Sequence, residues 1–143
     1  MPDKTALVTG GSKGIGLETA RQLGQRGWKV GMAARGEKAL HDAAATMDAA
    51  SVLPLVCGVS DVASVMAAPS VLVARFGQVT ALVNNAGIID PVGRLHETDP
   101  RRLDAAATDQ YRQRDVATRA VRPGMLAAGR GLIINLSSGA AMC

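Results

Sequence analysis

The chain has 143 residues, 48% of them hydrophobic, and its formal net charge of +4 comes from 16 basic and 12 acidic side chains. This length predicts a single domain over residues 1–143 with an aliphatic core, because only 2% of the residues are aromatic. There is neither an apolar run of about 18 residues nor a signal segment at the start, which excludes a membrane-spanning protein and predicts a cytoplasmic one.

The basic excess lies entirely in residues 100–143, but its arginines are dispersed and are not interleaved with aromatic side chains. Nucleic-acid binding is therefore not expected. The two cysteines, Cys57 and Cys143, are too few for a disulfide framework, and neither they nor the two histidines have metal-ligand spacing. We expect no metal, no nucleic acid and no membrane among the partners of this chain.

The first element is a short apolar strand, predicted over Ala6–Val8, which leads into a glycine-rich run at residues 9–16. An amphipathic helix is predicted over Ile15–Arg26. Its apolar face is formed by Ile15, Thr19, Ala20 and Leu23. A strand, a glycine-rich turn and a helix start are together typical of a dinucleotide-binding loop. The alternative is a glycine-rich turn that binds no ligand.

Three glycines of this run have distinct predicted roles. Gly10 permits a tight turn, Gly14 lets the backbone approach a pyrophosphate, and Gly16 lets the helix pack closely against the strand. The helix N-terminus then offers N–H groups and the positive end of a dipole to phosphates. The run therefore predicts a site for the pyrophosphate of a dinucleotide.

The end of the second strand, predicted over Trp28–Ala34, indicates which dinucleotide binds. Ala34 stands where an acidic residue would bind a ribose 2′-hydroxyl, and Arg35 follows it. A guanidinium can pair with a 2′-phosphate through two hydrogen bonds, and Lys13 in the glycine run adds a second positive charge. We therefore favour NADP(H) over NAD(H). The alternative is that both are solvated cations in loops.

The middle of the chain predicts two further helices with a strand between them. The helices cover Glu37–Asp48 and Val62–Phe76, and the strand covers Ser51–Cys57. Pro54 cannot donate a hydrogen bond within a sheet, so this strand is expected at an edge. Pro69 removes a hydrogen bond inside the second of these helices, so a kink or break is expected there.

The last third of the chain predicts a strand over Thr80–Val83, a helix from Pro100 to Met125, and a strongly apolar strand over Leu132–Leu136. Within the helix, residues 108–115 carry four charges and one apolar side chain, which does not suit a buried face. Two interpretations of this stretch are a solvated turn of helix and a local, compensated change of reading frame.

Three motifs follow one another in the chain: T-G-x-x-x-G-x-G at residues 9–16, N-N-A-G at residues 84–87 and I-N-L-S-S at residues 134–138. With these motifs the sequence resembles the short-chain dehydrogenase/reductase family from about residue 4 to the last residue. The resemblance implies an α/β fold, a Rossmann-like doubly wound parallel sheet of strand order 3-2-1-4-5 that lacks the family's C-terminal strands and helices. It also implies an NADP(H)-dependent oxidoreductase that transfers hydride to or from a carbonyl or alcohol substrate.

The resemblance also implies roles for single residues. Ser138, the second serine of the third motif, would bind the reacting oxygen of the substrate, and Gln110 stands where the family's proton relay has an Asn. Asn84, the first residue of the second motif, is expected to fix the central strands. The implied cofactor-binding residues are Thr9, Gly10, Ser12, Lys13, Gly14, Ile15, Gly16, Arg35, Val59, Asn85, Ala86 and Gly87.

The sequence also departs from the family's pattern. The general acid/base motif Tyr-x-x-x-Lys does not occur, since the only tyrosine, Tyr111, is followed four residues later by Asp115. Gly58 stands where the family has an Asp that binds the adenine. The competing hypothesis is therefore a non-catalytic NADP-binding module or an inactive truncated product. The family is usually homo-oligomeric, and the outer edge of the fifth strand is expected to be unpaired and open to association.

Overall fold

The computed structural model describes residues 4–57, 62–85 and 100–136, with side chains for all of these except residues 100–113. The strands in these ranges are β1 (Thr5–Thr9), β2 (Lys29–Ala34), β3 (Val52–Val56), β4 (Ala81–Asn84) and β5 (Leu132–Asn135). The helices are α1 (Gly14–Gln25), α2 (Glu37–Ala45), α3 (Val62–Phe76) and α4 (Pro100–Ala128). Strands and helices alternate along the chain, which is the pattern of a parallel α/β sheet.

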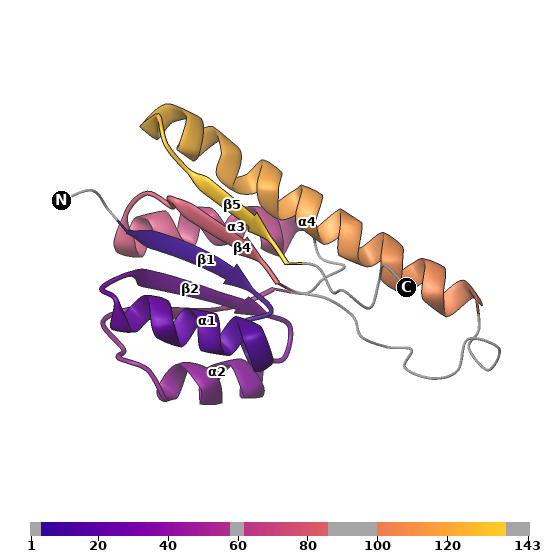
Figure 1. Ribbon diagram of the computed structural model, residues 1–143, viewed down its shortest axis with the longest axis horizontal. Helices are drawn as coiled ribbons and strands as arrows, with labels where there is room; N and C mark the ends of the chain where they lie inside the picture. Colours follow the sequence, from indigo (N-terminus) through magenta and orange to yellow (C-terminus); the bar gives the residue numbers. More distant parts are fainter. Residues whose placement is uncertain (1–3, 58–61, 86–99, 137–143) are drawn as a thin grey trace.

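These strands are parallel, and their order across the sheet is β3-β2-β1-β4-β5 (Figure 1). The fold and the strand order predicted from the sequence are therefore confirmed. The strand order reverses between β1 and β4, because β2 and β3 lie on one side of β1 while β4 and β5 lie on the other. In open α/β sheets, ligands bind at this reversal point, outside the carboxyl ends of the strands.

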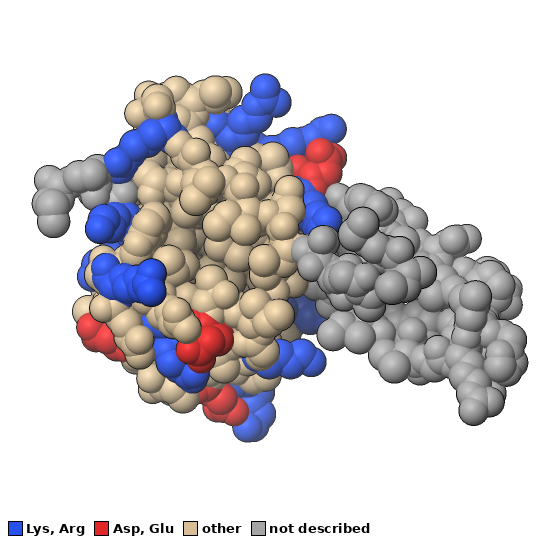
Figure 2. Space-filling model, viewed as in Figure 1, with Lys and Arg blue, Asp and Glu red and all other residues tan. Residues whose placement is uncertain are grey.

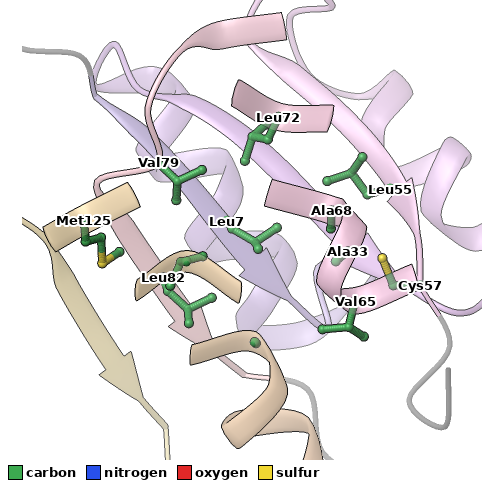
Figure 3. Close-up of a cluster of buried hydrophobic side chains, with 12 residues drawn as sticks. Leu7, Ala33, Leu55, Cys57, Val65, Ala68, Leu72, Val79, Leu82 and Met125 are labelled. Atoms are coloured by element: carbon green, nitrogen blue, oxygen red, sulfur yellow. The ribbon is translucent and has the colours of Figure 1, made fainter. Parts of the chain in front are cut away.

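Helices cover both faces of the sheet. On one face, α1 and α2 pack over a cluster of buried side chains that includes Val8 of β1 and Ala20 of α1. On the other face, α3 and α4 pack over a second cluster, which contains Leu7 and Leu82 of the two central strands and Leu72 of α3 (Figure 3). β1 is buried over its whole length, as its uncharged sequence predicts for a central parallel strand.

The two outer strands differ in their free edges. The N–H of Cys57 donates to the carbonyl of Ala34 over 2.8 Å. Because N–H groups point alternately to the two sides of a strand, the nitrogen of Pro54 faces away from β2. The edge position predicted for β3 is therefore confirmed. β5 is paired with β4 alone among the described strands, and all of its residues are exposed.

Of the kink or break expected at Pro69, the break does not occur. α3 continues through Pro69, which is buried together with Val65, Ala68 and Leu72. The packing of this helix face against the sheet and α4 offsets the hydrogen bond that the proline removes. Propensity alone therefore did not decide the course of this helix.

The apolar face expected for α1 is also partly wrong. Gly16 and Ala20 are buried and Leu23 packs beside them, but the side chain of Ile15 is 69% exposed. Ile15 lies in the first turn of the helix, next to the carboxyl edge of the sheet.

Within the described ranges, no helix is both long and apolar enough to cross a bilayer.

Candidate cofactor-binding site

The glycine run forms the turn between β1 and α1 at the carboxyl edge of the sheet. Gly10 and Gly14 have φ angles of +66° and +59°, which a residue with a Cβ adopts only with strain. The N–H of Gly11 donates to the carbonyl of Ala33 over 3.2 Å, and this bond ties the turn to β2. The conformation of the turn therefore depends on glycine at two positions.

Gly16 lies where α1 comes closest to the turn. A Cβ at this position would overlap the carbonyl oxygen of Gly10 and the side-chain amide of Asn85. Only a residue without a side chain fits between these groups. Gly16 therefore allows the close packing of the helix that the sequence predicted.

Asn85 joins the glycine turn to β4 across the reversal point. Its Nδ2 donates to the carbonyl of Gly10 over 3.2 Å, and its backbone N–H donates to Oγ1 of Thr9 over 3.0 Å. Oγ1 of Thr9 in turn donates to the carbonyl of Val83 over 3.4 Å. The carboxyl ends of β1 and β4 are thus cross-linked by two side chains, which fix the position of the turn.

The N-terminus of α1 is open to a ligand. Lys13 occupies the cap position, but its side chain makes no capping hydrogen bond, and the first turn carries no acidic residue. The first N–H groups of a helix have no partners within the helix and carry the positive end of its dipole. Apart from the adjoining residues and the backbone of α1, no described residue lies within 4 Å of the place that a Cβ of Gly14 would take. A pyrophosphate fits this open, positively polarised surface.

Lys13 and Arg35 bring two positive charges to the same edge of the sheet. Both side chains are exposed, Lys13 in the turn and Arg35 directly after β2. The bond from Gly11 to Ala33 holds the turn beside the end of β2. That strand ends in Ala34, so no carboxylate at this position repels a phosphate on the ribose.

The other side of the reversal point is formed by the ends of β4 and β5. Asn84 is 2% exposed, and its Nδ2 donates to Oδ1 of Asn135 at the paired position of β5 over 2.8 Å. Oδ1 of Asn84 is buried and has no hydrogen-bond partner among the described residues. The N–H of Leu136 donates to the carbonyl of Asn84 over 3.1 Å. Asn84 therefore joins β4 to β5.

Two residues at this end were not predicted as part of the site. Asn135 could have been found by aligning the carboxyl ends of the two apolar strands, since both end in Asn. Arg114 of α4 donates from Nη2 to the carbonyl of Leu136. It belongs to the charged stretch 108–115, and a fully solvated turn is the wrong interpretation for Arg114, whose side chain is half-buried.

Ser12 lies in the glycine turn and is half-buried, and the other residues of the predicted site lie outside the described part of the chain. These other residues are Val59, Ala86, Gly87 and Ser138, together with Gly58 at the adenine-binding position. Gln110 lies in α4, but its side chain is not described. No group of three or more His, Cys, Asp or Glu side chains in the described ranges could hold a metal ion.

The parallel sheet, the glycine turn and the open helix N-terminus define a dinucleotide-binding fold of the Rossmann type. A family model identifies which family of dinucleotide-binding proteins the chain matches. The model of the family described as short chain dehydrogenase matches residues 4–143. The chain belongs to the short-chain dehydrogenase family.

Two curated relatives have similar sequences over nearly the whole chain. Cis-4-hydroxycyclohexanecarboxylate dehydrogenase of Sinomonas cyclohexanicum is 38% identical over 143 residues, which cover 95% of this chain and 55% of the relative. 2-(R)-hydroxypropyl-CoM dehydrogenase of Xanthobacter autotrophicus is 35% identical over 144 residues, which cover 97% of this chain and 58% of the relative. The chain thus spans about half the length of the curated relatives that it matches.

Solved structures show the same fold. The crystal structure of a metagenomic short-chain oxidoreductase in complex with NADP aligns with a TM-score of 0.82 at 36% identity and covers 94% of this chain and 62% of that one. A short-chain dehydrogenase from Streptomyces avermitilis also aligns with a TM-score of 0.82, at 33% identity, and covers 95% of this chain and 49% of that one.

Proposed function

We propose that residues 1–143 form the NADP(H)-binding domain of an oxidoreductase that transfers hydride between the nicotinamide cofactor and a carbonyl or alcohol substrate. The observation that carries this proposal is the glycine turn, which Gly16 and Asn85 hold beside an uncapped helix N-terminus. Family membership and the structural neighbour in complex with NADP support it.

Each part of the site has a role in this proposal. The backbone from Gly10 to Gly16 and the N–H groups at the start of α1 bind the pyrophosphate. Lys13 and Arg35 bind the 2′-phosphate, and the exposed Ile15 offers an apolar contact to the cofactor. The other proposed cofactor contacts are Thr9, Ser12, Val59, Asn85, Ala86 and Gly87.

The chemistry of the reaction is divided between the cofactor and the chain. NADPH, when bound, supplies the hydride. Ser138 donates a hydrogen bond to the substrate oxygen on which negative charge develops. The specific substrate is then set by residues around this oxygen rather than by the glycine turn.

The cofactor assignment is tested by titrating the purified chain with NADPH and with NADH. We expect NADPH to bind at least about tenfold more tightly, a difference of about 1.4 kcal/mol, because two cations face the 2′-phosphate. Lys13→Ala and Arg35→Ala should each weaken NADPH binding by about fivefold to tenfold and leave NADH binding within about twofold.

The matched control is Arg26→Ala, which removes an exposed cation at the opposite end of α1. This variant should bind both cofactors as the unmodified chain does. Equal affinities for NADPH and NADH in the unmodified chain would contradict the assignment of NADP(H).

A non-catalytic NADP-binding module is the second candidate, because Gln110 stands where the family's proton relay has an Asn. It predicts the same NADPH binding without NADPH oxidation when aldehydes and ketones are added. NADPH oxidation that Ser138→Ala reduces by at least about tenfold would favour the oxidoreductase. Binding without any turnover would favour the module, and absence of binding would contradict both.

A further inference from the structure

Arg114 lies on the inward face of α4. From Arg114, intervals of three or four residues lead to Ala117, Val121 and Met125, which places all four on one side of the helix. The last three are buried in the cluster that also contains Leu82 of β4. An arginine therefore continues a row of core side chains toward the carboxyl edge of the sheet.

The guanidinium of Arg114 is bonded at one nitrogen and buried at another. Its Nη2 donates to the carbonyl oxygen of Leu136, directly after β5. Its Nε is buried and has no hydrogen-bond partner among the described residues. A charged group that turns inward loses hydration, and this loss must be offset by its hydrogen bonds. The bond to Leu136 is charge-assisted, which makes it stronger than a bond between neutral groups.

Leu136 is the residue at which the chain leaves β5. Its N–H donates to the carbonyl of Asn84, and its side chain packs against the cluster that contains Val8 on the opposite face of the sheet. Leu136 is therefore held through its N–H by β4, through its carbonyl by α4 and through its side chain by the core. Ser138 follows two residues later in the sequence.

We propose that Arg114 is a positioning residue for Ser138. By fixing the carbonyl of Leu136, Arg114 holds the residue that lies two positions before the serine in the sequence. The inference rests on the role proposed above for Ser138. It gives one residue of the charged stretch 108–115 a specific task, whereas the neighbouring Asp115 pairs with Arg119 on the exposed side of the helix over 3.2 Å.

Two variants of Arg114 and one control test this role. Arg114→Gln shortens the side chain and removes its charge, while Arg114→Lys keeps a cation that can donate. Arg119→Gln is the matched control, because Arg119 lies in the same helix and its side chain is 73% exposed. Amide hydrogen exchange is followed residue by residue by NMR on the whole chain. The Leu136 amide reports on the end of β5, and the Leu82 amide reports on the core.

We expect the Leu136 amide to exchange at least about tenfold faster in Arg114→Gln, with little change at Leu82. Arg114→Lys should restore most of the protection, and Arg119→Gln should behave as the unmodified chain. Unchanged exchange at Leu136 in a folded Arg114→Gln protein would overturn the proposal. An equal loss of protection at Leu82 would also overturn it, because the effect would then be a general loss of stability.

The NADPH oxidation assay supplies the functional readout. In Arg114→Gln we expect kcat to fall by at least about fivefold while the KM for NADPH stays within about twofold, because Arg114 acts on the serine side and not on the phosphate side. Arg114→Lys should recover most of the lost kcat. An unchanged kcat in Arg114→Gln would contradict the proposal.

The outcomes for the two proposals remain distinguishable. If the unmodified chain fails to bind NADPH, the proposed function is wrong, and amide exchange at Leu136 still decides whether Arg114 fixes the end of β5. If Arg114→Gln does not fold, Arg114→Lys decides instead. If the Leu136 amide of Arg114→Lys is fully protected from exchange, a cationic donor at position 114 is supported. If the Leu136 and Leu82 amides of this variant lose protection equally, the proposal is overturned.

Discussion

The two sides of the reversal point are stabilised in different ways. At the glycine turn, Gly16 and Asn85 fit against a turn that follows the fully buried strand β1. At the end of β5, every strand residue is exposed, and the chain is held by its pairing with β4 and by polar contacts of Asn84 and Arg114. The proposed cofactor side is therefore supported by the core, while the proposed substrate side depends on a few hydrogen bonds and on the partly buried side chain of Leu136.

The arrangement of the helices explains this difference. In Figure 1, α1 and α2 lie over the β1–β3 side of the sheet, and no described helix covers β4 and β5 on the same face. Figure 2 shows that the middle of this face carries no charged side chain. Leu132, Ile133 and Ile134 of β5 are exposed. Apolar surface of this kind is typical of a region that packs against a further element or a partner.

The largest expected effect is on the free energy of unfolding, and it comes from a comparison of the central strand β4 with the outer strand β5. Leu82→Ala removes a fully buried side chain and should lower the free energy of unfolding by about 2–5 kcal/mol through the cavity that it leaves. Ile133→Ala, at a position that is 36% exposed, should cost less than about 1.5 kcal/mol. Urea denaturation measures both. Equal losses of unfolding free energy would mean that the side chains of β5 are packed as tightly as those of β4. The proposed difference between the cofactor side and the substrate side would then be wrong.

A second prediction tests the close packing at the turn. Gly16→Ala should lower the free energy of unfolding by about 1–3 kcal/mol and weaken NADPH binding at least about tenfold, because the added Cβ displaces the turn. Gly24→Ala in the same helix is the control, since its Cβ would lie 3.2 Å from the flexible end of Met47.

The control variant should be neutral or more stable by up to about 1 kcal/mol, because alanine favours a helix. Thermal unfolding and NADPH titration are measured for both variants. If Gly16→Ala binds NADPH as tightly as Gly24→Ala does, the close contact at Gly16 is not needed for the cofactor site.

The smallest expected effect concerns the bond between the two asparagines. A double-mutant cycle of Asn84→Ala and Asn135→Ala should give a coupling free energy of about 0.5–1.5 kcal/mol, because each single variant already breaks the same hydrogen bond. Urea denaturation of the four proteins measures it. A coupling free energy near zero would show that β5 is held by the backbone ladder alone.

Much of the fold follows from local sequence. The strand order could be predicted because three motifs in sequence order give the chain its family resemblance, and Pro54 together with that resemblance indicated an edge strand. The predictions for Ile15 and for a break at Pro69 failed for a common reason, which is that tertiary structure decided the outcome at both positions. A helical pattern does not tell where a helix extends beyond its sheet, so the exposure of Ile15 was missed. The cost of Pro69 was known, but the packing energy that offsets it depends on the tertiary structure.

The candidate site likewise has a part that could be predicted from the sequence and a part that could not. The glycine turn and Arg35 could be predicted, because the turn is continuous in sequence and Arg35 directly follows the end of a strand. The bonds of Asn85 to Gly10 and of Arg114 to Leu136 could not, since they join residues 75 and 22 positions apart. Such contacts depend on the register of the strands and on the rotation of α4, which local periodicity does not determine.

Pro54 also determines in which direction the sheet can grow. Its nitrogen faces outward from β3 and carries no hydrogen, so a strand added there would find a donor missing. On β5, the N–H of Leu132 is bonded toward β4, so alternation turns the N–H groups of Ile133 and Asn135 outward. A further strand, of the same polypeptide or of a second copy, therefore adds most readily at β5. If two copies joined through their β5 strands, the free edges of the combined sheet would be the two β3 strands, each of which carries Pro54. Further strands would then not add, and association would stop at a dimer.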